Sequence, residues 1–234
     1  MREFSGFTGV LYSTTEWIMR FSVVNILWFT INLPIVIILL SLYVNNFSME
    51  FVIYFVPLLL LIPLLFVPST MGLFAMARDW VMKLDHPSLT RAYFSHMKSN
   101  YKKSVLAGII LTFIWLIWII DFYFFRNQSD LLLIVFSIVG LVLFVCTINF
   151  FSLHVHFHMN IREMLKNTFF ITFGSPLLFL GILLSNGILF YLSATKLIFL
   201  LPLFTGSLSA YVAFALFYSF SLKIQEKALT NKST

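Results

Sequence analysis

Six long stretches without a charged side chain constrain this chain more than any other feature. Each contains 17 residues or more when the sequence is divided at every Asp, Glu, Lys and Arg. They are residues 21–49, 51–77, 104–120, 131–161, 167–195 and 197–222. A helix needs about 20 apolar residues, and at least about 17, to cross the hydrocarbon core of a bilayer. Every stretch is therefore long enough to span a membrane.

Composition supports lipid as the solvent for these stretches. Hydrophobic residues make up 60% of the chain and charged residues 10%, whereas soluble domains are about 45–50% apolar and about 25% charged. Backbone polar groups in lipid need partners within their own segment, so each stretch should be helical. The sequence predicts an all-α polytopic transmembrane bundle, a single domain over 1–234. Its crossings are expected near 21–44, 51–77, 104–122, 131–155, 167–192 and 197–222.

The distribution of basic residues predicts the orientation. Thirteen of the fifteen Lys and Arg residues lie in segments 1–20, 78–103, 162–166 and 223–234. Only Arg126 and Lys196 lie in the intervening connections. Basic residues stay on the cytoplasmic side of a membrane, so both termini are predicted to be cytoplasmic. The net charge of +6 thus indicates topology, and no nucleic-acid partner is expected.

Two of the basic segments have an amphipathic pattern. Residues 1–20 are predicted to lie along the inner leaflet, and 78–103 to form a basic cytoplasmic loop whose second half is either interfacial or a solvated loop-helix. The candidate interaction surface on this loop consists of Arg78, Arg91, Lys98, Lys102 and Lys103.

Proline and glycine mark two expected helix breaks, at Pro68 and at Gly174-Ser175-Pro176. Paired breaks can mark a substrate site in membrane proteins, and this interpretation makes Ser69, Thr70 and Ser175 candidate lining residues. The alternative is that neighbouring helices satisfy the freed backbone groups. Residues 51–83 are expected to form either one kinked helix or a spanning helix followed by an interfacial one.

The search for reactive groups gives little. All nine acidic residues lie at or beyond the ends of the uncharged stretches, which disfavours a proton-coupled pump. Polar residues inside the stretches are predicted to be hydrogen-bond partners between helices. Examples are Asn25, Asn32, Thr147, Asn149, Ser185 and Asn186.

The most metal-like motif is His154, His156 and His158, because residues 154 and 158 would share a helix face. It has no accompanying H-E-x-x-H pattern, so these side chains are either weak metal ligands or polar interface residues. The sequence shows no catalytic constellation, and we expect no enzyme activity, no resident metal and no cofactor.

Several short motifs carry a family resemblance, in order along the chain. They are Phe4-Ser5-Gly6-Phe7, Glu16-Trp17-Ile18, the segment from Pro68 to Ala75 with Arg78 and Trp80, the Lys98 to Lys103 element, and Leu165-Lys166-Asn167 with Gly174 and Pro176. Together they resemble the YesL family, a bacterial membrane family without an assigned reaction.

The resemblance implies a multi-pass protein of the bacterial plasma membrane. Genes of the family often stand beside genes for carbohydrate uptake through ABC transporters. We therefore expect an accessory partner of such a system, with the bilayer and a transport permease or membrane sensor as its contacts. The alternative is an autonomous carrier or channel for a small neutral solute. Neither the oligomeric state nor the ligand follows from the sequence.

Overall fold

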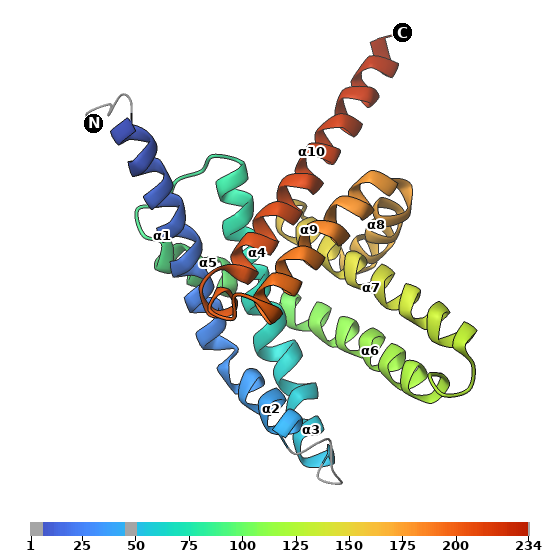
Figure 1. Ribbon diagram of the computed structural model, residues 1–234. Coiled ribbons are helices and arrows are strands. Elements are labelled where there is room, and N and C mark those ends of the chain that lie inside the picture. Colours follow the sequence, from blue (N-terminus) through green and yellow to red (C-terminus); the bar gives the residue numbers. More distant parts are fainter. Residues whose placement is uncertain (1–6, 45–50, 234) are drawn as a thin grey trace.

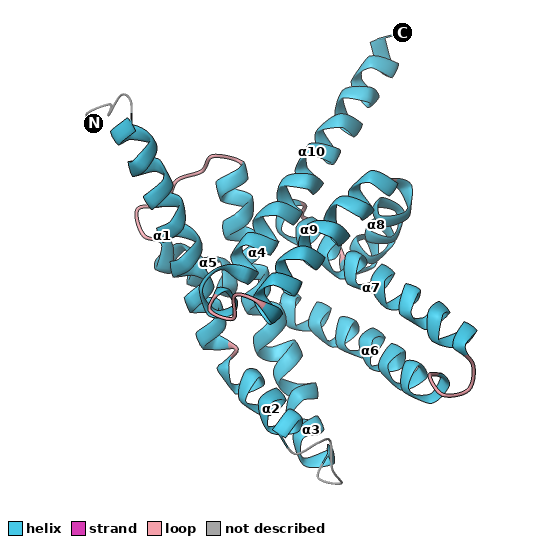
Figure 2. Ribbon diagram, viewed as in Figure 1, coloured by secondary structure: helices cyan, strands magenta, loops and turns pink. Residues whose placement is uncertain are grey.

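The computed structural model describes residues 7–44 and 51–233, and every regular element in these two ranges is a helix (Figure 1, Figure 2). In chain order they are α1 (Phe7–Ile31), α2 (Leu33–Val44), α3 (Phe51–Leu61), α4 (Val67–Val81), α5 (Leu89–Ser99), α6 (Tyr101–Phe125), α7 (Asp130–His156), α8 (Ile161–Gly174), α9 (Pro176–Thr195) and α10 (Gly206–Ser233). Two π-helical turns, Ile62–Phe66 and Leu201–Thr205, precede α4 and α10.

Within the two described ranges, five helical stretches are long and apolar enough to cross a membrane. They are Tyr54–Val81, Tyr101–Phe125, Asp130–His156, Pro176–Thr195 and Leu201–Lys227. The pair Gly9–Ile31 and Leu33–Val44 makes a sixth if the two helices, bent by 65°, form one broken span. The prediction of an all-α polytopic bundle with about six spans is confirmed.

Helix α4 lies at the centre of the bundle, where it contacts α1, α5, α6, α7 and α10. Helices α2 and α3 form one hairpin and α6 and α7 another, and the two project from the centre in different directions (Figure 1). The outer ends of α1 and α10 lie at the same end of the molecule, opposite the α2–α3 hairpin (Figure 1).

The side chains are sorted as expected for a protein in lipid. On α6, Phe113, Ile117 and Ile120 are each more than half exposed. By contrast, Asn149 and Asn186 are completely buried. A soluble fold buries its apolar residues and exposes its polar ones, so the reversed arrangement supports a multi-pass membrane protein.

The first predicted crossing, 21–44, is bent at Asn32. Pro34 lacks the N–H that would continue the hydrogen-bond ladder of α1. The Asn32 side chain donates to the Trp28 carbonyl (2.7 Å) and to the Ser69 hydroxyl (2.9 Å). A proline and a side-chain amide that bonds both backbone and neighbour therefore account for the bend. Upstream, residues from Phe7 onward belong to the same helix α1, so the predicted interfacial segment 1–20 is not separate over this range; residues 1–6 lie outside the described ranges.

The predicted break at Pro68 is wrong, and residues 54–81 form one continuous helical stretch. Pro68 withholds a hydrogen bond from the Leu64 carbonyl, four residues earlier. The Tyr101 hydroxyl donates to that carbonyl instead (3.0 Å). A partner from α6, together with the π-helical turn, thus lets the helix continue past the proline, and the kinked single helix is the correct geometry of the two expected.

The second predicted break is present. Ser175 has an extended backbone (φ −135°, ψ 92°), as expected for a residue that precedes proline. It ends α8 and caps α9 by accepting from the Leu178 N–H (3.3 Å). The break divides the predicted crossing 167–192, and the membrane-length helix begins at Pro176.

Candidate functional site

Two of the three predicted lining residues belong to the packed interior. Ser69 is fully buried and accepts from the Asn32 amide, and Thr70 accepts from the Trp28 indole N–H (3.0 Å). Ser175 lies at the break between α8 and α9 and caps α9. None of these three residues lines the cleft described next.

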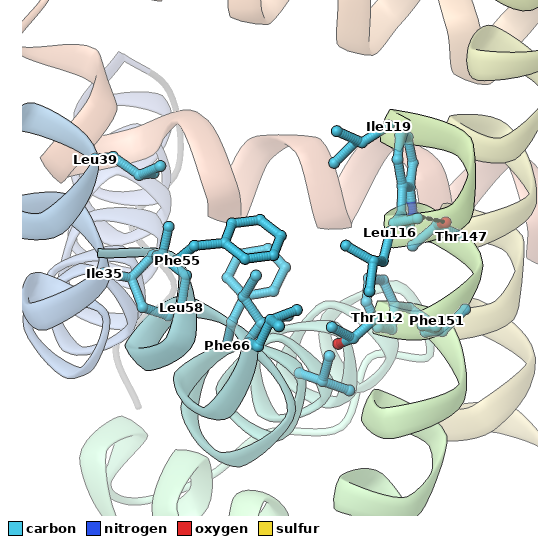
Figure 3. Close-up of a pocket in the computed structure, with 15 residues that line it drawn as sticks. Ile35, Leu39, Phe55, Leu58, Phe66, Thr112, Leu116, Ile119, Thr147 and Phe151 are labelled. Atoms are coloured by element: carbon cyan, nitrogen blue, oxygen red, sulfur yellow. Dashed lines mark hydrogen bonds between the residues drawn. The ribbon is translucent and has the colours of Figure 1, made fainter. Parts of the chain in front are cut away.

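An apolar cleft of about 370 Å³ lies between the two projecting hairpins (Figure 3). Ile35 and Leu58 contribute one wall, and Leu116 and Phe151 the other. The Thr112 hydroxyl also lies at the cleft, and no described group hydrogen-bonds to it. Cavities of about 300–1,000 Å³ suit a small ligand or a few large side chains. The lining favours an apolar occupant.

A second feature is polar and lies where α4 ends and turns back. The Leu84 N–H donates to the Asp79 carbonyl (2.8 Å) and the Lys83 N–H to the Trp80 carbonyl (3.2 Å). This pair of bonds is a Schellman motif, which requires a left-handed residue just past the helix. Lys83 adopts that conformation (φ 58°). The turn brings the following loop, with His86, back over Asp79.

Helix α5 supplies the other side of this polar feature. The Ser88 hydroxyl caps it by accepting from the Arg91 N–H (3.4 Å). Tyr93 is fully buried and donates to the Ser69 carbonyl (3.0 Å), and burial raises the pKa of its phenol. A Cβ on Gly72 of α4 would come within 3.2 Å of the Tyr93 ring, so glycine permits the close approach of α4 and α5. His96, three residues after Tyr93, shares this inward face.

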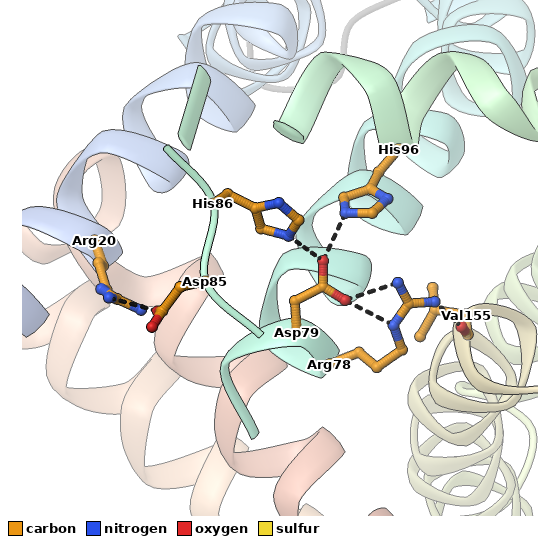
Figure 4. A network of polar contacts seen from close by, with 7 residues as sticks. All are labelled: Arg20, Arg78, Asp79, Asp85, His86, His96 and Val155. Atoms are coloured by element: carbon orange, nitrogen blue, oxygen red, sulfur yellow. Dashed lines mark hydrogen bonds and ion pairs between the residues drawn. The ribbon is translucent and has the colours of Figure 1, made fainter. Parts of the chain in front are cut away.

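Asp79 is the centre of the resulting network (Figure 4). Its carboxylate is 1% exposed, and Oδ2 lies 2.7 Å from Nε2 of His86 and 2.8 Å from Nε2 of His96. Arg78 donates to Oδ1 through Nε (2.9 Å) and Nη2 (2.7 Å), and through Nη1 to the Val155 carbonyl (2.6 Å). A buried carboxylate requires such compensation, because an unpaired charge costs several kcal/mol on burial.

The loop that carries His86 is also held from outside. Asp85 accepts a hydrogen bond from Nη2 of Arg20 on α1 (2.8 Å; Figure 4). The same guanidinium pairs with Glu16. One loop is therefore fixed to α1 on one side and to α4 on the other. The arrangement can hold a buried negative charge beside two imidazole side chains that are partly exposed to solvent.

The five basic residues predicted to form a cytoplasmic surface do not act as one group. Arg91, Lys98 and Lys102 are exposed, and Lys103 is half-buried. Arg78 points inward onto Asp79 and the end of α7. The residues available for contact are thus those of α5 and the first turn of α6.

The predicted histidine motif is separated by the end of α7. His154 is buried, His156 packs against Phe157 and Phe217, and His158 is exposed. Instead, the described residues bring Asp79, His86 and His96 together, with one ligand atom from each lying within 4.8 Å of the others. Sequence reasoning missed this set because its members come from α4, a loop and α5.

Comparison with known proteins gives relatives but no assigned activity. Residues 21–122, which include the network around Asp79, match a family described as protein of unknown function, DUF624. The chain is 26% identical over 227 residues to the uncharacterized protein YteU of Bacillus subtilis (strain 168), covering 96% of this chain and 90% of YteU. It is 23% identical over 161 residues to the uncharacterized protein YesL of the same organism, covering 68% of this chain and 65% of YesL. No solved structure matches.

The matched stretch extends from α1 to α6, so it contains α4 and the helix α5 that packs on it. The resemblance expected from the short motifs is confirmed: this chain is a homologue of YteU and YesL, uncharacterized proteins of the DUF624 family.

Proposed function

We propose that this protein is a non-enzymatic accessory partner of a carbohydrate uptake system in the bacterial plasma membrane. The observation that carries the proposal is the apolar cleft between the α2–α3 and α6–α7 hairpins. Its occupant would be a transmembrane helix of a transport permease or of a membrane sensor. The carbohydrate system comes from the family resemblance, which associates such proteins with ABC-type uptake genes.

Several polar groups of the described interior are paired with one another, although Oδ1 of Asn149 and the Thr168 hydroxyl have no partner. Asn149 donates to the Thr172 hydroxyl (3.0 Å), and Ser193 and Thr205 share a hydrogen bond (2.6 Å). Ser209 donates to the Asn186 side chain. Groups paired in this way hold helices together in lipid. They favour a packed interior over a solute path.

The cleft suits a partner helix in both shape and chemistry. It opens between two hairpins rather than into the centre of the bundle (Figure 3), so an occupant can approach from the bilayer. Small and large apolar side chains of a helix could fill it. The exposed basic residues of α5 would add a contact outside the membrane.

The test is recovery of the partner from the native host. The tagged full chain, expressed at its native level and solubilised in mild detergent, should co-purify with a carbohydrate permease or a membrane sensor in near-equal amount by mass spectrometry. Leu116→Trp fills the cleft and should reduce this recovery at least about tenfold, because a partner–protein contact worth about 1.4 kcal/mol is lost. Ile117→Trp, on the adjacent lipid-facing side of α6, is the matched control and should leave recovery unchanged.

Recovery of the protein alone, together with unchanged sugar uptake in a deletion strain, would contradict the accessory role. The second candidate, an autonomous carrier for a neutral solute, would then be tested by flux into reconstituted vesicles. The helix break at Ser175 is the one observation that favours it, since broken helices form the solute sites of many transporters.

A further inference from the structure

We propose that Asp79, His86 and His96 form a binding site for a divalent first-row transition metal ion. This inference does not depend on the proposed partner function. It rests on the convergence of three ligand atoms, Oδ2 of Asp79 and Nε2 of each histidine, at one point between α4, its following loop and α5 (Figure 4).

The donor set has a recognised chemical preference. Two imidazole nitrogens and one carboxylate oxygen bind ions such as Fe²⁺, Co²⁺ and Zn²⁺, and they leave coordination positions open. An ion bonded at about 2.0–2.1 Å holds neighbouring ligand atoms about 2.9 Å apart in octahedral geometry. The two observed Nε2 to Oδ2 distances, 2.7 and 2.8 Å, are close to this value. The third pair, Nε2 of His86 and Nε2 of His96, lies within 4.8 Å, so the two rings would close around the ion.

The surroundings also resemble those of metal sites. Ligating carboxylates are usually fixed by hydrogen bonds on their other oxygen, and Arg78 makes two such bonds to Oδ1 of Asp79. The carboxylate is buried, whereas the side chains of His86 and His96 are 29% and 22% exposed. An ion can therefore enter from solvent and keep water on its open side.

A hydrogen-bond network without metal is the competing explanation. In that case each imidazole carries a proton on Nε2 and donates it to Oδ2. On metal binding, the same two nitrogens bind the ion, and each ring carries its proton on Nδ1. The positive charge of Arg78 opposes the ion, so we expect weaker binding than at a structural zinc site with four protein ligands.

Glutamine substitutions distinguish the two explanations. His86→Gln and His96→Gln each keep an N–H donor for Oδ2 but replace the imidazole ligand. The matched control is His158→Gln, at an exposed histidine outside the cluster. The full chain in nanodiscs, stripped with chelator, is titrated with Co²⁺ alone and with Zn²⁺ alone by calorimetry, and its thermal unfolding is followed at each metal concentration.

We expect one ion per chain and a rise in the unfolding temperature for the native protein and for His158→Gln. Affinity should fall more than about tenfold in His86→Gln and in His96→Gln, since even changes behind the ligands cost about 10–100-fold. The glutamine variants should retain the unfolding temperature of the metal-free native protein, which shows that they fold. Absence of binding by the native protein, or equal binding by the glutamine variants, would overturn the proposal.

Discussion

Asn25 shows how a single buried amide organises two helices. Its Nδ2 donates to the Leu201 carbonyl (3.0 Å), and its Oδ1 accepts from the Ser207 N–H (2.9 Å). These two groups flank the π-helical turn before α10, where the regular hydrogen-bond ladder is interrupted. Gly206 makes the approach possible, since a Cβ there would lie 3.0 Å from Oδ1 of Asn25. The nitrogen and the oxygen of one amide thus join α1 to the irregular backbone before α10.

Replacing this amide should therefore destabilise the fold. Asn25→Ala leaves two buried backbone groups without their partner, at a cost of about 1–3 kcal/mol each in the usual range. We expect a clear fall in the thermal unfolding temperature of the detergent-solubilised protein. Asn127→Ala, at an exposed position in the α6–α7 turn, should change stability by less than about 0.5 kcal/mol. Equal stability of the two variants would show that the amide is not needed to hold the turn.

The role of such polar residues follows from sequence, but the identity of their partners does not. The expectation that polar residues in the apolar stretches bond between helices is confirmed for Asn25, Asn32, Asn149 and Asn186. The Ser185 hydroxyl, by contrast, donates to the carbonyls of Gly181 and Ile182 in its own helix. A hydroxyl can reach the carbonyl three or four residues earlier, and nothing in the local sequence decides between that bond and a neighbour.

At the scale of elements, glycine sets the closest contact between α6 and the π-helical turn before α4. A Cβ on Gly108 would lie 2.9 Å from Cα of Pro63 and 3.1 Å from its carbonyl oxygen. These are backbone atoms of a turn that is itself constrained by proline, so they cannot move aside as a flexible side chain would. Small residues at such positions let membrane helices pack closely.

We expect Gly108→Ala to lower stability by about 1–3 kcal/mol, the usual cost of overpacking. Gly187→Ala on α9 is the matched control, because a Cβ there meets no atom within 4 Å. Alanine is the better helix former by about 1 kcal/mol, so this variant should be as stable as the native protein or more stable. Thermal unfolding in detergent compares the two. A Gly108→Ala protein as stable as the control would contradict the close packing of α6 on this turn.

Two prolines show how far element boundaries can be predicted. Both Pro68 and Pro176 remove a backbone donor, and the sequence treats them as equivalent. The helix continues past Pro68 because Tyr101 satisfies the freed carbonyl, and that partner lies on another helix. The chain breaks before Pro176 because Ser175 takes an extended conformation and caps the next helix. The outcome depends on tertiary contacts, which local sequence does not contain.

At the scale of the whole molecule, the apolar stretches predicted the number and nature of the spans, whereas the polar network was unpredictable. Asp79 and His96 meet because Gly72 lets α5 approach α4, and His86 joins them because Lys83 adopts a left-handed turn. A lysine is not the usual residue for that conformation. The closely spaced histidines His154, His156 and His158 gave a stronger sequence signal. The end of α7 nevertheless separates their side chains.

The predicted orientation of the molecule in the membrane rests on the distribution of basic residues. The outer ends of α1 and α10 lie at the same end (Figure 1), as an even number of spans would require. The single cysteine, Cys146, lies within α7. Its replacement by serine gives a background in which every new cysteine can be located by labelling.

In that background we predict two classes of position towards a membrane-impermeant maleimide. Asn127→Cys and Lys196→Cys, in the turns after α6 and α9, should be labelled in intact cells, because few basic residues lie there. Val10→Cys, Leu84→Cys and Lys227→Cys should be labelled only after permeabilisation. All five side chains are exposed, so accessibility within the protein does not limit the reaction. If Val10→Cys reacts in intact cells like Asn127→Cys and Lys196→Cys, while Leu84→Cys and Lys227→Cys do not, the bent pair α1–α2 is a re-entrant element and the chain crosses five times. If Leu84→Cys reacts in intact cells and Asn127→Cys does not, the predicted orientation is wrong.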